Sequence, residues 1–311
     1  MKKCVGVDLG GTTVKMGILG EDGTIFEKWE IPTRKEDNGK YILGDIAASA
    51  KELLAAAGIA DEDFVGVGIG VPGPVRSNGY VEVCVNLGWK DINPAAELSS
   101  LLGGVPVKAG NDANVAALGE QWMGSGKGHD SLMFFTLGTG VGGGLIIDGK
   151  IVAGSKGMGA EVGHLTVNPH EKDCCNCGNH GCLEQYASAT GITRLANRRL
   201  AKDDAPSILR GGEISAKTVF DAVKAGDKVA IEIAEQFGEY LGKGLAAVAS
   251  VVDPQIFVIG GGVSKAGDIL FKYIEPSYKR CAFGPCKQAK FALAKLGNDA
   301  GIYGAAALVL K

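Results

Sequence analysis

The chain has 311 residues, 46% of them hydrophobic and 22% charged, and a formal net charge of −3 at pH 7. This composition is typical of a compact folded protein, and it argues against a disordered chain and against a basic protein that binds nucleic acid through its charge. At roughly 100 to 200 residues per domain, the length predicts two domains with a cleft between them.

The sequence predicts neither a secretory signal nor a membrane anchor. The N-terminus reaches the charged residue Asp8 after too few apolar positions for a signal peptide. The longest apolar run, residues 244–252, is closed by Asp253 and Pro254 and is too short to span a membrane. We therefore expect a cytoplasmic protein with no membrane partner.

The first part of the chain predicts three short strands separated by tight turns. Apolar runs place these strands at 4–7, 14–19 and 24–31. The turn after the first strand reads Asp8-Leu9-Gly10-Gly11-Thr12-Thr13. Glycine has no Cβ and adopts positive φ at little cost, so a turn of this kind lets backbone N–H groups approach a phosphate.

Helix and strand alternate in the next segment. Residues 42–57 have helical spacing, and residues 65–71 form an apolar strand that ends in a Pro-Gly-Pro turn. A further strand at 105–109 leads into a helix that runs from about Asp112 to Met123. This alternation predicts an α/β fold.

A second glycine turn repeats the opening arrangement. Strands are predicted at 132–137, 143–147 and 150–153, again with an acidic-glycine hairpin turn before the third. The same order of elements, found twice, indicates an internal duplication whose two half-sites close on one polyphosphate. The turn between the first two of these strands contains Gly138, Thr139 and Gly140.

The last part of the chain is mainly helical. Residues 183–200 and 218–249 have a helical pattern. A buried strand at 255–259 then ends in a third glycine turn, Gly260-Gly261-Gly262. A helix of small residues at 301–310 ends the chain, and we expect it to cross back to the first domain.

Two side chains near the first turn have chemistry that phosphoryl transfer requires. Such transfer is catalysed mainly by positioning and by stabilising negative charge. The carboxylate of Asp8, at the end of its strand, is suited to orient hydrated Mg²⁺, and the ammonium of Lys15 is suited to contact a phosphate. The alternatives are that Asp8 only caps a turn and that Lys15 is a solvated strand residue.

Asn111 and Asp112 stand where a predicted strand opens into a helix. Asp112 is a candidate general base, since a carboxylate at such a position can accept a hydroxyl proton. Asn and Asp are also preferred N-caps, so one of the two is expected to cap the helix. The spacing alone does not decide between these roles.

A dense group of cysteines predicts a metal site. Cys175, Cys177 and Cys182 are separated by glycines that let the chain wrap, and three thiolates at this spacing suit three corners of a tetrahedral zinc site. Four protein ligands would make the zinc structural, since no position remains for water. On spacing the fourth ligand is open among Cys174, His164, His170 and His180.

Two acidic residues flank this cysteine group. Glu161 stands three positions before His164, and Glu184 follows Cys182 by two. Paired carboxylates are good acceptors for the vicinal hydroxyls of a sugar, and a loop pinned by a metal would present both to one ligand. Either could equally be a surface acid.

Together these residues resemble the ROK family of sugar kinases and repressors, within the actin-like ATPase superfamily that includes hexokinases. The resemblance covers essentially the whole chain, and its most specific part is the run from Glu161 through Cys175-x-Cys177-Gly-x-x-Gly-Cys182-x-Glu184. It implies a two-lobed actin-like ATPase (ribonuclease H-like) α/β fold with duplicated βββαβαβα-type halves and an interdomain cleft. The implied small domain is 1–112 plus 297–311, and the large domain, with the zinc loop, is 113–296.

The resemblance also implies a role for each candidate residue. Asp112 is the catalytic base, and His164 is the fourth zinc ligand and also faces the sugar. Asn111, Glu161 and Glu184 hold sugar hydroxyls, and Cys174 is spare. The implied ATP and phosphate contacts are Asp8, Gly10, Gly11, Thr12, Lys15, Gly138, Thr139, Gly140, Gly260, Gly261 and Gly262.

The implied activity is phosphorylation of a sugar by ATP with Mg²⁺, in a homodimer that carries structural Zn²⁺. Residues 182–192 are similar to bacterial glucokinases of the family, so glucose is the leading substrate and its 6-hydroxyl the acceptor. N-acetylmannosamine, N-acetylglucosamine, mannose and fructose remain alternatives, and polyphosphate remains open as the donor. A sugar-responsive repressor would carry a helix-turn-helix before Asp8, and a chaperone-like ATPase would carry a large peptide-binding domain; neither is expected here.

Overall fold

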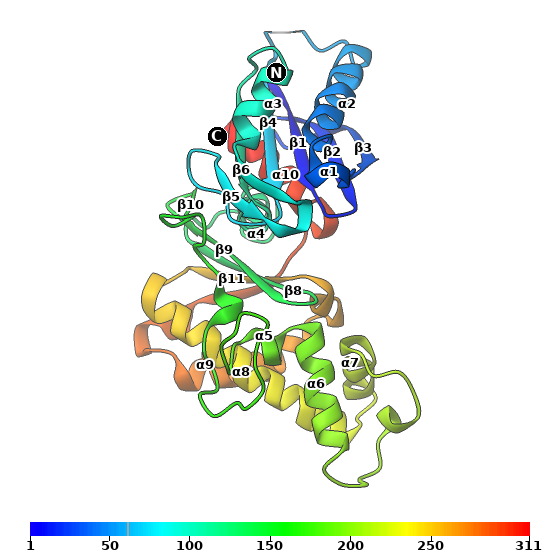
Figure 1. Ribbon diagram of the computed structural model, residues 1–311. Coiled ribbons are helices and arrows are strands. Elements are labelled where there is room, and N and C mark those ends of the chain that lie inside the picture. The colour runs from blue at the N-terminus through cyan, green and yellow to red at the C-terminus, as the bar shows by residue number, and fades with distance from the viewer. Residues whose placement is uncertain (61) are drawn as a thin grey trace. The chain divides into compact units, whose positions relative to one another are not determined.

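The fold is given by a computed structural model, which describes residues 1–60 and 62–311 (Figure 1). Contacts between residues divide the chain into two compact units. Unit 1 consists of Met1–Asp130, Gly144–Ala160 and Lys295–Lys311, and unit 2 consists of Ser131–Gly143 and Glu161–Ala294. Each unit therefore joins segments that are distant in the sequence.

The first half of the chain alternates strands and helices in the predicted manner. Its elements are β1 (Lys3–Leu9), β2 (Thr13–Gly20), β3 (Ile25–Pro32), α1 (Glu36–Gly39), α2 (Ile42–Ala56), β4 (Phe64–Val71), β5 (Val81–Cys84), β6 (Trp89–Ile92), α3 (Pro94–Leu101), β7 (Val107–Asn111) and α4 (Asp112–Met123). The main sheet has the order β3-β2-β1-β4-β7, in which β1, β4 and β7 run parallel and β2 is antiparallel to both its neighbours. β5 and β6 form a separate two-stranded sheet.

The second half repeats this plan. Its elements are β8 (Leu132–Leu137), β9 (Val141–Ile147), β10 (Lys150–Ile151), α5 (Glu184–Ala187), α6 (Ala189–Leu200), α7 (Ala216–Lys224), α8 (Lys228–Val252), β11 (Ile256–Gly260), α9 (Ile269–Cys281), β12 (Lys290–Leu293) and α10 (Ala300–Leu310). The sheet order β10-β9-β8-β11-β12 matches β3-β2-β1-β4-β7 position by position. This match confirms the internal duplication predicted from the two glycine turns.

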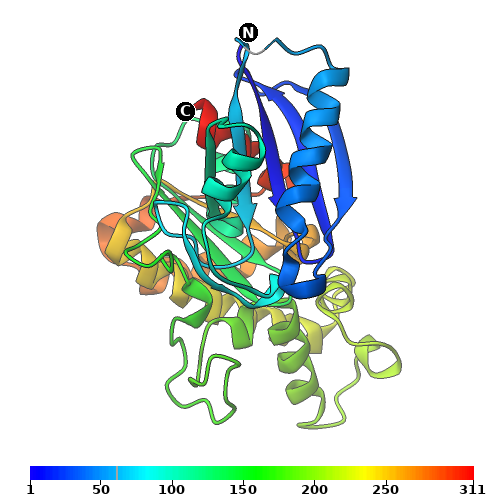
Figure 2. The ribbon, with the colours of Figure 1, turned by 45° about the horizontal axis from the view of Figure 1, so that its top comes forward.

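β1 shows how the sequence selects the two faces of the first sheet. Val5, Val7 and Leu9 belong to a buried cluster with apolar residues of α2 and α3. The alternate residue Gly6 faces α10, where a Cβ would lie 2.3 Å from the carbonyl oxygen of Ile302. Because strand side chains alternate, α2 and α10 cover opposite faces of this sheet (Figure 2).

The C-terminal helix α10 belongs to unit 1. It packs against β1, β4 and α4. The approach is very close, since a Cβ on Gly68 of β4 would lie 1.7 Å from the carbonyl oxygen of Ala305. Small residues on both sides therefore let the last helix lie directly on the first sheet.

Aromatic rings fill the core of unit 2. Phe257 of β11 has its ring centroid 5.5 Å from that of Phe291 in β12 and 5.6 Å from that of Tyr278 in α9. The 25-residue helix α8 packs along α9 and also contacts α5, α6 and α7.

Over residues 1–60 and 62–311, no helix is both long enough and apolar enough to cross a membrane.

Predicted strands are mostly found, and the errors have local causes. The strand predicted at 105–109 is β7, two residues later, because Pro106 has no N–H for a sheet hydrogen bond. The strand predicted at 150–153 is only the two-residue β10. Helix α9 was not predicted, and it contains Pro276, a residue that ordinarily ends a helix.

Each of the two long helical regions is divided in the structure. The region 183–200 forms α5 and α6, because Ser188 leaves the helical conformation and its hydroxyl caps α6. The region 218–249 forms parts of α7 and α8, because Gly226 adopts a φ of 81° and Asp227 caps α8.

Candidate functional site

The first glycine turn joins β1 to β2 in unit 1. Asp8 and Lys15 are paired across these strands, so their side chains lie on the same face of the sheet. This face is covered by α10, where a Cβ on Gly301 would lie 2.5 Å from Asp8 Cγ. Burial raises the pKa of Asp8, and the nearby charge of Lys15 opposes that rise. The carboxylate and the ammonium selected from the sequence are therefore neighbours.

Hydrogen bonds fix the conformation of this turn. The N–H of Gly10 donates to the carbonyl of Thr13 at 3.0 Å. Thr33, directly after β3, donates its hydroxyl to the Gly10 carbonyl at 2.7 Å and its N–H to the Thr12 carbonyl at 2.9 Å. The turn is thus ordered by the protein alone, as a preorganised anion site requires.

Asn111 and Asp112 lie where β7 meets α4. Asn111 caps the helix, as its Oδ1 accepts the N–H of Asn114 at 3.1 Å. Its Nδ2 donates to the carbonyl of Gly73 at 3.1 Å and to Asp112 Oδ1 at 2.9 Å. Asp112 Oδ1 also accepts the N–H of Ala113 at 2.8 Å. Asn111 therefore caps α4 and also orients the exposed carboxylate of Asp112.

Sequence analysis missed the residues that support Asn111. The sequence predicts the turn at Pro72 and Gly73 only as the end of a strand. In the structure the buried thiol of Cys84 donates to the Pro72 carbonyl at 2.7 Å. Burial raises the pKa of Cys84, and the charge of Asp112 adds to that rise. These contacts join residues from separate strands, and no spacing in the sequence signals them.

The second and third glycine turns lie next to each other in unit 2. They follow β8 and β11, which are adjacent parallel strands with Thr136 opposite Gly260. Gly261 has a φ of 82°, and a Cβ there would lie 2.6 Å from backbone atoms of Leu137. Only glycine fits this position, since a side chain would meet both strain and a clash. The structure thus brings together two of the three predicted nucleotide-binding turns.

Glu184 lies against the second glycine turn. Its Oε2 accepts the N–H of Val141 at 3.0 Å. A Cβ on Gly140 would lie 2.2 Å from the same oxygen. The other carboxylate oxygen, Oε1, is 3.9 Å from the Sγ of Cys175. One carboxylate therefore contacts both the glycine turn and the cysteine loop, which is residues 165–183 between the 3₁₀ turn at Val162–His164 and α5.

A pocket of about 350 Å³ in unit 2 collects several of the predicted residues. Glu161, His164 and Glu184 line it together with the second glycine turn. Glu161 and His164 come from either end of a 3₁₀ turn, in which the His164 N–H donates to the Glu161 carbonyl at 3.2 Å. The volume lies within the range of small-molecule sites.

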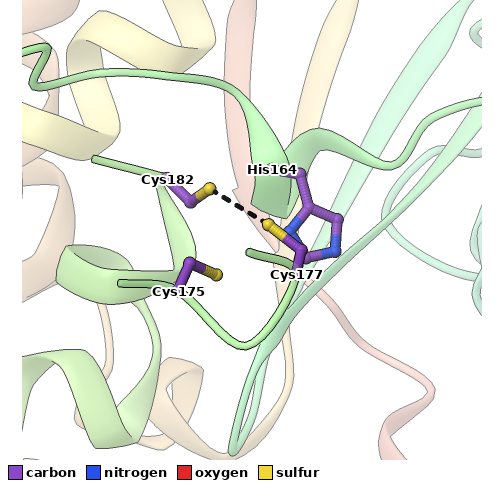
Figure 3. Close-up of side chains that lie close together, drawn as sticks. All are labelled: His164, Cys175, Cys177 and Cys182. Carbon is purple, nitrogen blue, oxygen red and sulfur yellow. Dashed lines mark hydrogen bonds between the residues drawn. The ribbon is translucent and has the colours of Figure 1, made fainter. Parts of the chain in front are cut away.

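Four candidate metal ligands meet beside this pocket (Figure 3). The ligand atoms of His164, Cys175, Cys177 and Cys182 all lie within 4.8 Å of one another. The chain reverses at Gly178, whose N–H donates to the Cys175 carbonyl at 2.9 Å and whose φ is 89°. Within the described part of the chain, this cluster does not include the other candidates Cys174, His170 and His180.

The chemistry of the cluster fits zinc. Burial raises the pKa of Cys182 to about 12 and also raises that of Cys175, whereas the backbone of Asn179 lowers that of Cys177. Thiolates at the two buried positions therefore need a positive charge close by. Three thiols and an imidazole are a donor set typical of structural zinc, and they occupy all four positions of a tetrahedral site.

Comparison with known proteins identifies the family. The ROK family model matches residues 4–311. The chain is 42% identical to a glucokinase of Halalkalibacterium halodurans, over 98% of this chain and 94% of that protein. It is 37% identical to a glucokinase of Thermotoga maritima, over 99% and 97%.

A solved structure extends this comparison to the fold. The ROK family glucokinase from Streptomyces griseus, in complex with glucose and AMPPNP, aligns with a TM-score of 0.75 and 36% identity over 99% of each chain. The fold is that of the actin-like ATPases, as the sequence indicated. The chain belongs to the ROK family.

Proposed function

We propose that this protein is a glucokinase, which transfers the γ-phosphoryl group of ATP to the 6-hydroxyl of glucose. The observation that carries the proposal is the unit 2 pocket, where Glu161 and Glu184 lie beside a glycine turn and a four-ligand cluster. Such carboxylates are suited to accept hydrogen bonds from sugar hydroxyls. Relatives named glucokinase at 37% and 42% identity support the same substrate.

In this proposal the glycine turns bind ATP. Backbone N–H groups of Gly10–Thr12 and Gly138–Gly140 contact the phosphates, and Gly260–Gly262 contact the adenosine. Asp8 orients hydrated Mg²⁺, which neutralises charge on the phosphates, and Lys15 contacts a phosphate oxygen. The Streptomyces griseus relative, which binds AMPPNP, supports ATP as the donor.

Asp112 is the proposed general base. Its carboxylate accepts the proton of the 6-hydroxyl while that oxygen attacks the γ-phosphorus and ADP leaves. The hydrogen bonds from Asn111 and from the Ala113 N–H hold the carboxylate in one orientation, which such a transfer requires. Asn111 is also proposed to bind a sugar hydroxyl, together with Glu161, His164 and Glu184.

Zinc is proposed to bind His164, Cys175, Cys177 and Cys182. When bound, it supplies a cross-link that fixes the cysteine loop rather than an activated water. The loop in turn holds Glu184 and His164 at the pocket wall. Sugar affinity should therefore depend on the metal even though the metal takes no part in the chemical step.

The test is release of ADP from Mg-ATP in the presence of glucose, mannose, fructose, N-acetylglucosamine or N-acetylmannosamine, with Asp112→Asn as the blank. A clear preference for glucose is expected. Preference for an N-acetyl sugar would retain the kinase mechanism and replace the substrate. No activity with any of the five sugars would overturn the proposal.

A further inference from the structure

Glu171 is a buried carboxylate in the cysteine loop that takes no part in the metal cluster. Its side chain is only 4% exposed. Oε2 accepts hydrogen bonds from the hydroxyl of Tyr186 at 2.5 Å, from Arg198 Nη1 at 2.8 Å and from Arg194. Oε1 accepts from Arg198 Nη2 at 2.9 Å and from the next two backbone N–H groups at 2.8 and 2.9 Å.

These partners make Glu171 the centre of a buried charge network rather than one half of a surface ion pair. A buried carboxylate is stable as an anion only when it is paired and hydrogen-bonded. The hydrogen bonds from Arg198 hold the pKa of Glu171 well below its usual range, against the effect of burial. By contrast, Glu232 pairs with Arg199 of the same helix α6 at 2.5 Å, but its side chain is 49% exposed. Exposed pairs of that kind contribute little.

The network reaches the pocket through α5, a helix of a single turn. Glu184 contacts the second glycine turn, as described above. The side chain of Gln185 accepts the N–H of Cys182 at 3.1 Å and donates to the carbonyl of Asp173 at 3.0 Å. Tyr186 donates to Glu171. Three consecutive residues of α5 therefore contact the glycine turn, a metal ligand and the buried carboxylate.

Helix α5 is too short to be stable without contacts from the rest of the protein. One helical turn is unstable without tertiary contacts, so α5 takes its place from the groups around it. Tyr186 stacks on Tyr240 of α8 with ring centroids 3.9 Å apart, and Asn168 donates to the Tyr186 hydroxyl at 2.9 Å. The metal cluster fixes one part of the loop, and the Glu171 network fixes the part on the side of α6.

We propose that Glu171 is a positioning residue for sugar binding. Its bonds to Tyr186, Arg194 and Arg198 join the cysteine loop to α5 and α6, and they thereby fix α5 and the carboxylate of Glu184. The inference deepens the proposed glucokinase function and rests on it. It assigns to Glu171 an effect on sugar affinity that is separate from metal binding.

The test uses the full-length zinc-loaded protein and the isosteric variant Glu171→Gln. We expect the Kd for glucose, measured by calorimetry, to rise about tenfold or more, because a displaced carboxylate loses charge-assisted hydrogen bonds to the sugar. The KM for ATP should change by less than about threefold, since a change confined to the sugar site leaves other binding steps intact. The zinc content should stay near that of the wild type, because all four ligands remain. The matched control Glu232→Gln removes a carboxylate that pairs with the same helix, and it should leave all three quantities unchanged.

Tyr186→Phe is the second variant in case Glu171→Gln does not fold, because it keeps the ion pairs of Glu171 with Arg194 and Arg198. It removes one hydrogen bond to Glu171, and the Kd for glucose should rise about threefold. Unchanged glucose affinity in both variants, or an equal loss of sugar and ATP binding, would overturn the inference. Wild-type protein that phosphorylates no sugar would instead overturn the proposed function, so the two failures are distinguishable.

Discussion

The two halves of the chain share one strand order and differ in what is inserted after the third strand. In the first half, only the short helix α1 and the longer helix α2 lie between β3 and β4. In the second half, β10 is followed by the cysteine loop and by α5 to α8 before β11. Each half has a glycine turn between its first two strands. The four candidate metal ligands and most of the charged residues of the unit 2 pocket, by contrast, belong to the insertion.

Under the proposed function, this difference separates the residues that act on the phosphates and the proton from those that bind the sugar. Asp8 and Asp112, the residues proposed to act on the phosphates and on the proton, belong to the first half. Glu161 and Glu184, proposed to bind the sugar, stand in or beside the insertion of the second half. Substitution of Asp8 or Asp112 should therefore affect turnover, and substitution of Glu161 or Glu184 should affect sugar affinity.

The largest expected effect is that of Asp112→Asn. Loss of a general base typically lowers the rate by about 10² to 10⁴-fold, so kcat should fall in that range while the Kd for glucose changes little. Steady-state kinetics and calorimetry measure the two quantities. Asp204→Asn, in an exposed loop, is the control. Near-normal turnover of Asp112→Asn would remove Asp112 from the base role.

Gly140→Ala tests the contact between the second glycine turn of the duplicated frame and Glu184 of the insertion. The new Cβ would lie 2.2 Å from Glu184 Oε2 and displace that carboxylate. The Kd for glucose should rise about tenfold or more, because the displaced carboxylate loses charge-assisted hydrogen bonds to the sugar. Gly44→Ala is the matched control, since Gly44 is exposed on α2 and a Cβ there has no neighbour within 4 Å. Wild-type affinity in Gly140→Ala would show that Glu184 does not set sugar binding.

Substitution of one candidate metal ligand tests whether sugar affinity depends on the cysteine loop. Cys177→Ser should lose zinc, because only three of the four protein ligands remain. Sugar affinity should fall with it, because the loop beside Glu184 is then no longer fixed. Metal analysis and glucose titration on the same sample measure both. Cys174→Ser should keep its zinc, because Cys174 is outside the cluster. A zinc-free Cys177→Ser protein with full glucose affinity would contradict the structural role of the loop.

The smallest effect concerns pH and the Glu171 network. The folded-state pKa of Glu171 lies below its unfolded value, so the folded state binds fewer protons and loses stability as the pH falls. This contribution is fully present above the unfolded pKa of about 4.3 and is lost below it. Denaturant titrations at pH 7 to 3 should show a shallower fall in the unfolding free energy for Glu171→Gln than for the wild type. Parallel curves would show that Glu171 does not titrate differently on folding.

The duplicated frame was predictable because its signals are local. Each glycine turn follows an apolar strand, and the cysteine spacing indicates three ligands without any structure. The fourth ligand was open by spacing alone, because His164 lies on a separate 3₁₀ turn and joins Cys175 only in the folded chain.

The supporting contacts were not predictable, because they join side chains that are distant in the sequence. Nothing near Glu171 indicates that Arg194 and Arg198 will enclose it, since both lie on a helix that begins after the cysteine loop. The same is true of Gly73, whose carbonyl accepts from Asn111 across neighbouring strands. Backbone carbonyls have no sequence signature, so a side chain that they orient is recognised only in the structure.

The most direct test of these separate roles is the glucose Kd of three proteins, wild type, Asp112→Asn and Cys177→Ser. All three are purified in the same zinc-containing buffer and titrated side by side by calorimetry. The account predicts that Asp112→Asn binds glucose like the wild type, and that Cys177→Ser, which fails to retain its zinc, binds it much more weakly. Lost binding in Asp112→Asn together with wild-type binding in Cys177→Ser would contradict it.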